Sequence, residues 1–219
     1  MIYRVARAST SSVFDADWRR PVWAAAETLE LKHHMGERPA HFPKTQARLV
    51  YDAEAIQGIF RVEDRWVRAV AEKNQDNVCR DSCVEFFFTT GADLGRGYFN
   101  FEINCGGVFL FRWQRAQGRE ARALTEEECG RIAVVSTLPR RVTPEIAAPT
   151  TWQIAFRVPF DILERYSEVS RPARGATWRA NFYKCGSDTS RPHWLTWAPV
   201  DFPKPQFHLP EFFGELAFA

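Results

Sequence analysis

Hydrophobic and polar residues alternate along most of the chain. In YFNFEIN (98–104), Phe99, Phe101 and Ile103 share one face of an extended segment, and polar residues occupy the other face. A repeat of two residues is typical of a β-strand, in which successive side chains point to opposite faces. Similar patterns predict strands at 47–52, 58–64, 84–88, 107–113, 131–136, 152–160, 178–185 and 214–218.

Turn-forming segments separate these strands, and helical patterns are few. Residues 89–97, 104–107, 171–177 and 185–192 are rich in Gly, Pro, Ser or Asn and are predicted to be turns and loops. Two short helices are predicted, at 160–167 and at 125–132, where Thr125 and Glu128 form a capping-box pattern. Regularly spaced strands with so few helices predict an all-β fold, a single-domain antiparallel β-sandwich over residues 1–219.

The charge balance argues against nucleic acid or an anionic membrane as a partner. The chain has 29 basic and 27 acidic residues, a net charge of +2. No apolar run approaches the roughly 20 residues of a membrane-spanning helix. Residues 1–20 contain no apolar stretch of the kind found in secretory signal peptides. The chain as written is therefore expected in the cytoplasm, unless a signal has been removed from it.

The stretch NVCRDSCVEFFF (77–88) raises the question of a metal site. Cys79 and Cys83 are four residues apart, whereas a zinc knuckle uses C-x₂-C with a second ligand pair. On one strand, side chains at this spacing lie about 13 Å apart. We therefore expect a loop cysteine and a strand cysteine, with Cys83 on the same face as Glu85. The five cysteines are expected to be reduced thiols, and the scattered histidines indicate no metal site.

Polar residues line one face of three predicted strands. They are Glu85 on the first strand, Tyr98, Asn100, Glu102 and Asn104 on the second, and Arg179, Asn181 and Tyr183 on the third. Carboxyl, amide and guanidinium groups can pair with sugar hydroxyls, and aromatic rings can stack on pyranose rings, in a concave site. A solvated sheet face would give the same pattern. Glu85 and Glu102 could also act as the two carboxylates of a glycoside hydrolase.

Several segments together resemble the carbohydrate-binding module family 9-like domains of the DOMON-like superfamily. They are TQARLVYD (45–52), VEDRWVRA (62–69), DSCVEFFF (81–88), YFNFEIN (98–104), RANFYKCG (179–186) and FHLPEFFGEL (207–216). The resemblance implies a DOMON-like β-sandwich of immunoglobulin or jelly-roll type. It also implies non-catalytic binding of a saccharide, in the family the reducing end of a glycan held between two tryptophans. Such modules usually accompany polysaccharide-degrading enzymes.

The resemblance also implies which residues would bind the sugar. The acidic ligand of the family falls on Glu85, and its two amides fall on Asn104 and Asn181. Its arginine falls on Arg191, and its second stacking aromatic residue falls on Phe207, just before the P-x-x-F-G motif.

Two positions depart from the family pattern. Cys79 stands where the family has its first stacking tryptophan, and Glu102 stands where an arginine is expected. Losing a stacking ring costs on the order of 1 kcal/mol, unless Trp66, Trp194 or Tyr183 replaces it. The departures therefore bear on the specificity for a reducing end rather than on the fold.

Two ligands other than a sugar follow from the same resemblance. Calcium is a structural ion in some family members, and Asp64 and Asp81 offer oxygen ligands for it, although isolated surface acids give the same pattern. A haem-binding DOMON-like domain would need axial ligands, for which Met35 and His208 are available. No other cofactor is expected.

Overall fold

The computed structural model describes residues 1–8 and 14–219. Residues 9–13 belong to the N-terminal segment considered for a signal peptide, and that part of the prediction lies outside the described residues. No described helix is long and apolar enough to cross a membrane.

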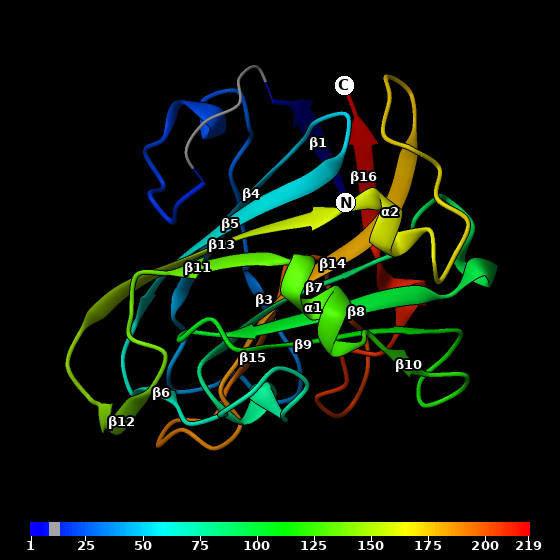
Figure 1. Cartoon of the computed structure of the whole chain (residues 1–219). Coiled ribbons are helices and arrows are strands. Elements are labelled where there is room, and N and C mark those ends of the chain that lie inside the picture. Colours follow the sequence, from blue (N-terminus) through cyan, green and yellow to red (C-terminus); the bar gives the residue numbers. More distant parts are fainter. Residues whose placement is uncertain (9–13) are drawn as a thin grey trace.

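The strands form two facing layers joined by one strand (Figure 1). The first layer contains β7 (Cys83–Phe88), β8 (Tyr98–Asn104), β9 (Phe109–Gln114), β10 (Arg122–Ala123), β14 (Thr177–Cys185) and β16 (Gly214–Phe218), with β15 (Trp194–Thr196) and β3 (His33–His34) at its edge. The second layer contains β4 (Lys44–Tyr51), β5 (Ala55–Asp64), β13 (Thr150–Pro159) and β11 (Ala133–Ser136), with the short β2 (Leu29–Glu30). β6 (Val67–Ala69) and β12 (Val142–Ile146) pair separately.

β1 (Ile2–Arg7) joins the two layers. Its residues Ile2–Val5 pair with β16, and Ala6 and Arg7 pair with β4. Both pairings are parallel, whereas the other recorded strand pairs are antiparallel. The predicted all-β sandwich is confirmed, and β1 is the exception to its antiparallel arrangement.

The helices are short, as predicted. α1 (Glu126–Arg131) begins with the predicted capping box: the Thr125 hydroxyl accepts from the Glu128 N–H, and the Glu128 carboxylate accepts from the Thr125 N–H. α2 (Phe160–Leu163) ends four residues before the predicted end of that helix. Single 3₁₀ turns occur at η1 (Pro21–Trp23), η2 (Val78–Arg80), η3 (Leu94–Arg96) and η4 (Pro210–Phe212).

Phenylalanine rings fill the space between the layers. Phe86 stacks on Phe88 at 4.4 Å and on Phe182 at 4.9 Å between ring centroids, and Phe101 stacks on Phe111 at 4.4 Å. A Cβ at Gly58 would lie 2.3 Å from the Phe156 ring, so glycine lets the aromatic layer approach β5. These apolar positions are the alternate residues of the predicted strands.

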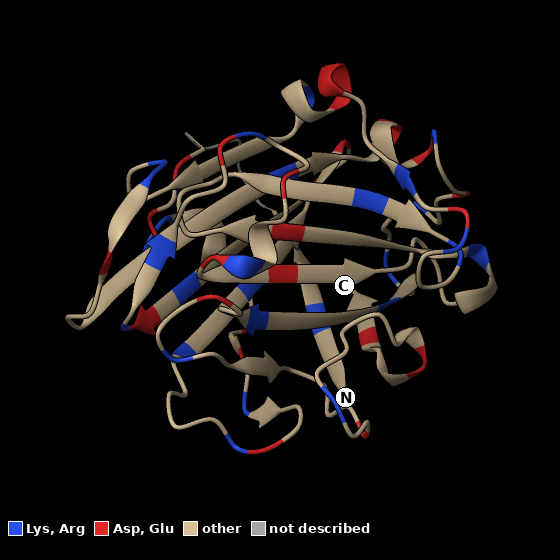
Figure 2. Ribbon diagram, turned by 90° about the horizontal axis from the view of Figure 1, so that it is seen from below, with Lys and Arg blue, Asp and Glu red and all other residues tan. Residues whose placement is uncertain are grey.

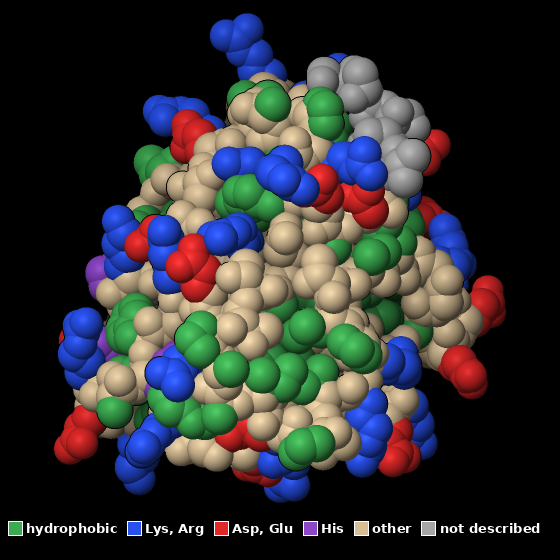
Figure 3. Space-filling model, turned by 90° about the vertical axis from the view of Figure 1, so that its left-hand side faces the viewer, with side chains coloured by type: hydrophobic (Ala, Val, Ile, Leu, Met, Phe, Trp, Pro, Cys, Tyr) green, Lys and Arg blue, Asp and Glu red, His purple; other side chains and the backbone are tan. Residues whose placement is uncertain are grey.

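Charged residues are interspersed along the ribbon rather than gathered in one region (Figure 2). On the face at the left of Figure 1, hydrophobic side chains lie in groups between charged ones (Figure 3). The outer face of the first layer is different, because the segment that contains Phe207 and Phe213 folds over it and packs on Phe87 and Tyr98.

Candidate functional site

A small pocket lies on the outer face of the first layer. Glu85 on β7 stands directly opposite Glu102 on β8, and Cys83 stands opposite Cys185 on β14. The pocket has a volume of about 160 Å³. Its lining consists of strand residues below and loop residues above: Cys79, Glu85, Phe87, Glu102, Cys185, Ser187, Trp194, Pro205, Gln206, Phe207 and His208.

Two buried carboxyl groups form part of this lining. Glu85 is 2% exposed, and the Cys185 thiol donates to its Oε1 at 3.1 Å. Burial, with Cys185 and Glu102 nearby, raises the pKa of Glu85 well above its usual value and so favours its protonated form. Burial also raises the pKa of Glu102 to about 7, against the hydrogen bond donated by Asn100 at 2.9 Å. The pocket therefore presents carboxyl groups that can both donate and accept hydrogen bonds.

Asn100, which donates to Glu102, belongs to a hydrogen-bond network that also contains Gln114 and His208. Gln114 Nε2 donates to Asn100 Oδ1 at 2.9 Å and lies 3.0 Å from His208 Nδ1. The Tyr98 hydroxyl also lies 3.0 Å from His208 Nδ1. Burial lowers the pKa of His208 to about 4, so its ring is neutral at pH 7, and Nδ1 accepts from the Gln114 amide.

Two aromatic residues stand over the carboxyl groups. Phe207 stacks on Tyr183 with 4.1 Å between ring centroids and 12° between planes, and the Tyr183 hydroxyl donates to the Phe207 carbonyl at 3.1 Å. One face of Phe207 is thereby covered. Trp194 is half-buried, pairs with Cys185 across β15 and β14, and has no stacked aromatic partner among the described residues. Trp194 therefore offers the more available ring.

Of the seven residues predicted for the site, four line this pocket: Cys79, Glu85, Glu102 and Phe207. Burial raises the pKa of the Cys79 thiol to about 12, so that group remains protonated. The other three predicted residues, Asn104, Asn181 and Arg191, do not line the pocket.

The two asparagines lie on the same face of the sheet as Glu85, but their amides bond to the protein itself. Asn104 donates to Asp81 at 2.9 Å and accepts from the Gly106 and Val108 N–H groups. Asn181 donates to the Ala198 carbonyl at 3.1 Å and accepts from the Phe182 and Ala198 N–H groups. Both are fully buried, so they hold the chain beside the pocket instead of lining it.

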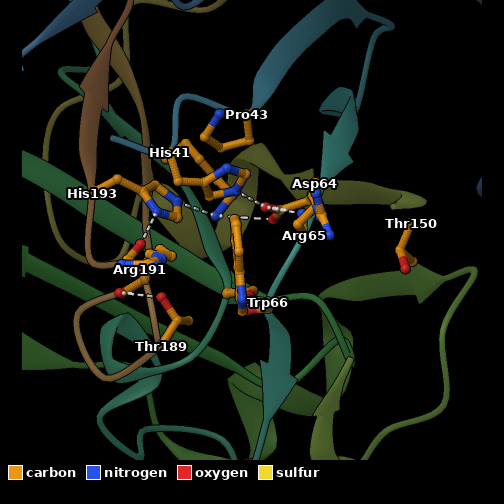
Figure 4. Close-up of polar contacts among 12 residues, drawn as sticks. His41, Pro43, Asp64, Arg65, Trp66, Thr150, Thr189, Arg191 and His193 are labelled. Carbon is orange, nitrogen blue, oxygen red and sulfur yellow. Dashed lines mark hydrogen bonds and ion pairs between the residues drawn. The ribbon is translucent and has the colours of Figure 1, made fainter. Parts of the chain in front are cut away.

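Arg191 lies in a separate cluster (Figure 4). It is exposed, and its guanidinium carbon lies 5.5 Å from the centroid of the Trp66 ring. Trp66 adopts a left-handed backbone conformation, with φ of 56°, and its ring also packs against His41 at 4.9 Å. Trp66 is therefore not the residue that replaces the missing ring at Cys79.

A buried ion pair lies behind Trp66. Asp64 lies 2.7 Å from His41 Nε2 (Figure 4). It is also 3.3 Å from the Lys184 ammonium and 3.2 Å from Trp152 Nε1, and Lys184 contacts His193 at 2.7 Å. Burial, together with Lys184, lowers the pKa of His193 to about 3. His193 therefore stays neutral beside the ammonium group.

The two aspartates considered for calcium, Asp64 and Asp81, are both engaged by nitrogen donors of the described chain. Both are buried, so the alternative that they are surface acids is wrong. Asp64 is surrounded by nitrogen donors, including Lys184. Asp81 accepts from the N–H groups of Val70 and Ala71 and from Asn104, and its second oxygen lies 3.8 Å from Arg68. Calcium takes six to eight oxygen ligands, whereas the recorded partners of both carboxylates are nitrogen atoms.

Several pocket residues lie far apart in the sequence and have no shared motif. Trp194 was considered only as a replacement ring, His208 only as a haem ligand, and Ser187, Gln206 and Cys185 only as parts of loops or strands. One feature of the sequence could have indicated that Gln206 and His208 line the site. They flank Phe207, just before the P-x-x-F-G motif at 210–214. A volume of about 160 Å³ is too small for a haem macrocycle at His208.

The pH dependence of stability should depend on Glu102. Its folded pKa of about 7 exceeds its ordinary value of 4.5, so its contribution to stability is fully present below 4.5 and is lost as pH rises through 7. Urea unfolding of the wild type and Glu102→Gln between pH 5 and 8 should show the variant gaining on the order of 2–3 kcal/mol relative to the wild type. A constant difference between the two proteins would contradict the pKa of Glu102.

Comparisons with known proteins bear on both the family and the fold of the chain. The sequence model of carbohydrate-binding family 9 matches residues 24–218. A candidate carbohydrate-binding protein from Bacteroides uniformis is 27% identical, with a TM-score of 0.89 over 100% of this chain and 99% of that one. No curated protein sequence matches the chain.

A more distant structural match is a family 9 module from Caldicellulosiruptor kristjanssonii. In complex with cellotriose it is 13% identical, with a TM-score of 0.66 over 100% of this chain and 93% of that one. In complex with glucose it is 13% identical, with a TM-score of 0.63 over 99% and 95% of the two chains. At 13% sequence identity, these two matches show that the fold is shared and nothing beyond the fold.

Proposed function

Because the chain belongs to carbohydrate-binding family 9, we propose that residues 1–219 form one non-catalytic domain whose pocket binds a single sugar ring. The ring is a free monosaccharide or the terminal unit of an oligosaccharide. The family 9 module from Caldicellulosiruptor kristjanssonii has been solved in complex with glucose and with cellotriose, which supports this ligand class.

The supporting observation is a pair of buried carboxyl groups beneath aromatic side chains. Glu85 and Glu102 line the floor of the pocket, and Trp194 and Phe207 line its walls. In this proposal the carboxyl groups pair with adjacent sugar hydroxyls, and the rings pack on the apolar face of the pyranose. The pocket is smaller than the roughly 300–1,000 Å³ of a typical small-molecule site, which favours one ring over a longer segment of glycan.

Trp194 takes the place of the family tryptophan that is missing at Cys79. Its ring is half-buried at the pocket and has no stacked aromatic partner among the described residues. Tyr183 is fully buried under Phe207 and cannot serve. The proposed stacking surface therefore comes from β15 instead of the loop before β7.

Isothermal titration calorimetry against glucose, xylose, galactose, cellobiose and their alditols tests the proposal. A free sugar should give saturable heat. If the pocket recognises the closed pyranose ring, the open-chain alditol should give none. Trp194→Ala should weaken binding about tenfold, since stacking and burial of one ring contribute on the order of 1–2 kcal/mol. Trp18→Ala, at a half-buried ring on the second layer, should leave affinity unchanged.

Heat from none of these sugars would reject carbohydrate binding at this pocket. Equal affinities of the wild type and Trp194→Ala would reject Trp194 as the stacking surface while leaving the pocket as the binding site.

A hydrolase remains the second candidate, since Glu85 and Glu102 are a direct cross-strand pair in one pocket. A retaining enzyme needs carboxyl groups about 5–5.5 Å apart, placed on either side of the scissile bond. Both groups here rise from the same sheet, which favours binding. Turnover of an aryl glucoside that disappears in Glu102→Gln would establish the enzyme, and a rate equal to the buffer control would reject it.

A further inference from the structure

The structure brings together two thiols and a carboxyl group that are far apart in the sequence. Cys83, Glu85 and Cys185 each offer one ligand atom, and these atoms all lie within 4.8 Å of one another. We propose that Cys83, Cys185 and Glu85 bind a thiophilic divalent cation of the zinc type at the floor of the pocket. This proposal does not depend on sugar binding.

The strand register fixes this arrangement. Cys83 and Cys185 are directly opposed on the antiparallel strands β7 and β14, and Glu85 is two residues further along the same face of β7. Side chains of directly opposed residues have Cβ atoms about 4.5–5.5 Å apart. The second thiol therefore comes from the neighbouring strand, and Cys79, the nearest cysteine in the sequence, is not in the group.

The distances suit a tetrahedral ion. With zinc–sulfur bonds of about 2.3 Å and zinc–oxygen bonds of about 2.0–2.2 Å, ligand atoms in a tetrahedral site lie roughly 3.5–3.8 Å apart. Cys185 Sγ and Glu85 Oε1 are already 3.1 Å apart. Small rotations of these side chains would bring all three ligand atoms to bonding distance.

The surroundings suit a cation that can enter from solvent. The three side chains are 0%, 2% and 1% exposed, yet Glu85 and Cys185 line the open pocket. No ion pair is recorded for Glu85 in residues 1–8 and 14–219, so no protein cation occupies its carboxyl group. A three-ligand site of this kind leaves a fourth position toward the pocket for water or a ligand hydroxyl.

The ligand types select the metal. Two sulfur ligands favour zinc and related soft ions, whereas calcium and magnesium bind oxygen. Cobalt(II) is a useful probe because it takes the same geometry and gives a thiolate charge-transfer absorbance.

The test uses the full chain, reduced, treated with EDTA and desalted. Cobalt(II) titration should give one equivalent of thiolate-to-metal absorbance, which added zinc abolishes. Cys83→Ser and Cys185→Ser should each weaken cobalt binding at least tenfold, and Glu85→Gln should weaken it about as much. Cys129→Ser, at a buried thiol beside Gln75, is the matched control and should bind as the wild type does.

The absence of the absorbance in the wild type, or its full retention in both Cys83→Ser and Cys185→Ser, would overturn the proposal. Near-ultraviolet circular dichroism of each variant separates lost ligation from lost folding. Glu85→Gln also remains informative if a serine variant unfolds, because it keeps both thiols. A zinc-induced rise in Tm should be the same in the wild type and Cys129→Ser and smaller in Glu85→Gln at equal zinc concentration.

Discussion

Asp64→Ala is expected to lower the free energy of unfolding by about 3–5 kcal/mol, because it leaves the Lys184 ammonium buried without its partner. The Asp64 and Lys184 side chains are both 0% exposed and lie 3.3 Å apart. His41 and Trp152 also lose their acceptor in this variant. Urea unfolding monitored by tryptophan fluorescence measures the change.

The double variant Asp64→Ala/Lys184→Met separates the pair from the loss of packing. Removing both charges should recover much of the lost free energy of unfolding, because proteins with a buried ion pair and with apolar residues in its place are often similarly stable. Glu63→Ala removes an adjacent exposed acid and should change stability by less than about 1 kcal/mol. A loss below about 1 kcal/mol for Asp64→Ala would show that Lys184 finds another partner or solvent.

The pH dependence of this pair has a defined sign. Burial alone would raise the pKa of Asp64, but the Lys184 charge and the His41 hydrogen bond hold it well below 3.8. A depressed carboxyl pKa stabilises the folded state at every pH above the ordinary value, and the contribution is lost only as pH falls through the folded value. The pair should therefore remain stabilising at mildly acidic pH.

Glu85→Ala is expected to weaken glucose binding roughly 5- to 150-fold, because a buried carboxyl that pairs with sugar hydroxyls contributes about 1–3 kcal/mol. The effect requires Glu85 to face the ligand, as its place in the pocket lining indicates. Calorimetry with the most tightly bound sugar measures the loss, and far-ultraviolet circular dichroism checks the fold.

Glu85→Gln is the informative companion variant. Because burial raises the pKa of Glu85 well above its usual value, the neutral amide resembles the protonated carboxyl group that burial favours. Sugar affinity should stay within about threefold of the wild type, whereas cobalt affinity should fall. Equal sugar affinities of Glu85→Ala and the wild type would remove Glu85 from the binding site and leave the metal proposal to its own test.

The sequence predicted much of the fold because the fold depends on local periodicity. The alternation in 98–104 placed Glu102 and Phe101 on opposite faces, as observed on β8. The capping box at Thr125 is likewise a local pattern. The switch of β1 between two parallel partners was missed, because nothing within residues 2–7 specifies which distant strands lie beside them.

The site was only partly predictable, for reasons of packing. The strand pattern placed Asn181 on the same face of the sheet as Glu85. Its amide, however, bonds to the backbone of Ala198, and no sequence pattern specifies that contact. Cys185 meets Cys83 only through the register of β14 against β7. Trp194 and His208 reach the pocket through loops whose conformations depend on the assembled sheet.

The position of β1 has a consequence for how the polypeptide reaches this structure. Tyr3 pairs with Leu216, so the strand that links the layers acquires its second neighbour only after residues 214–218 have left the ribosome. Pairing over so long a separation is slow, because closing a long loop costs entropy before any contact is gained. During synthesis β4 can pair with β1 early, while the residues of β1 that later pair with β16 remain unpaired. The nascent chain therefore has an unpaired strand edge until residues 214–218 have left the ribosome, and this edge is the place where we expect chaperone contact or misassociation during expression.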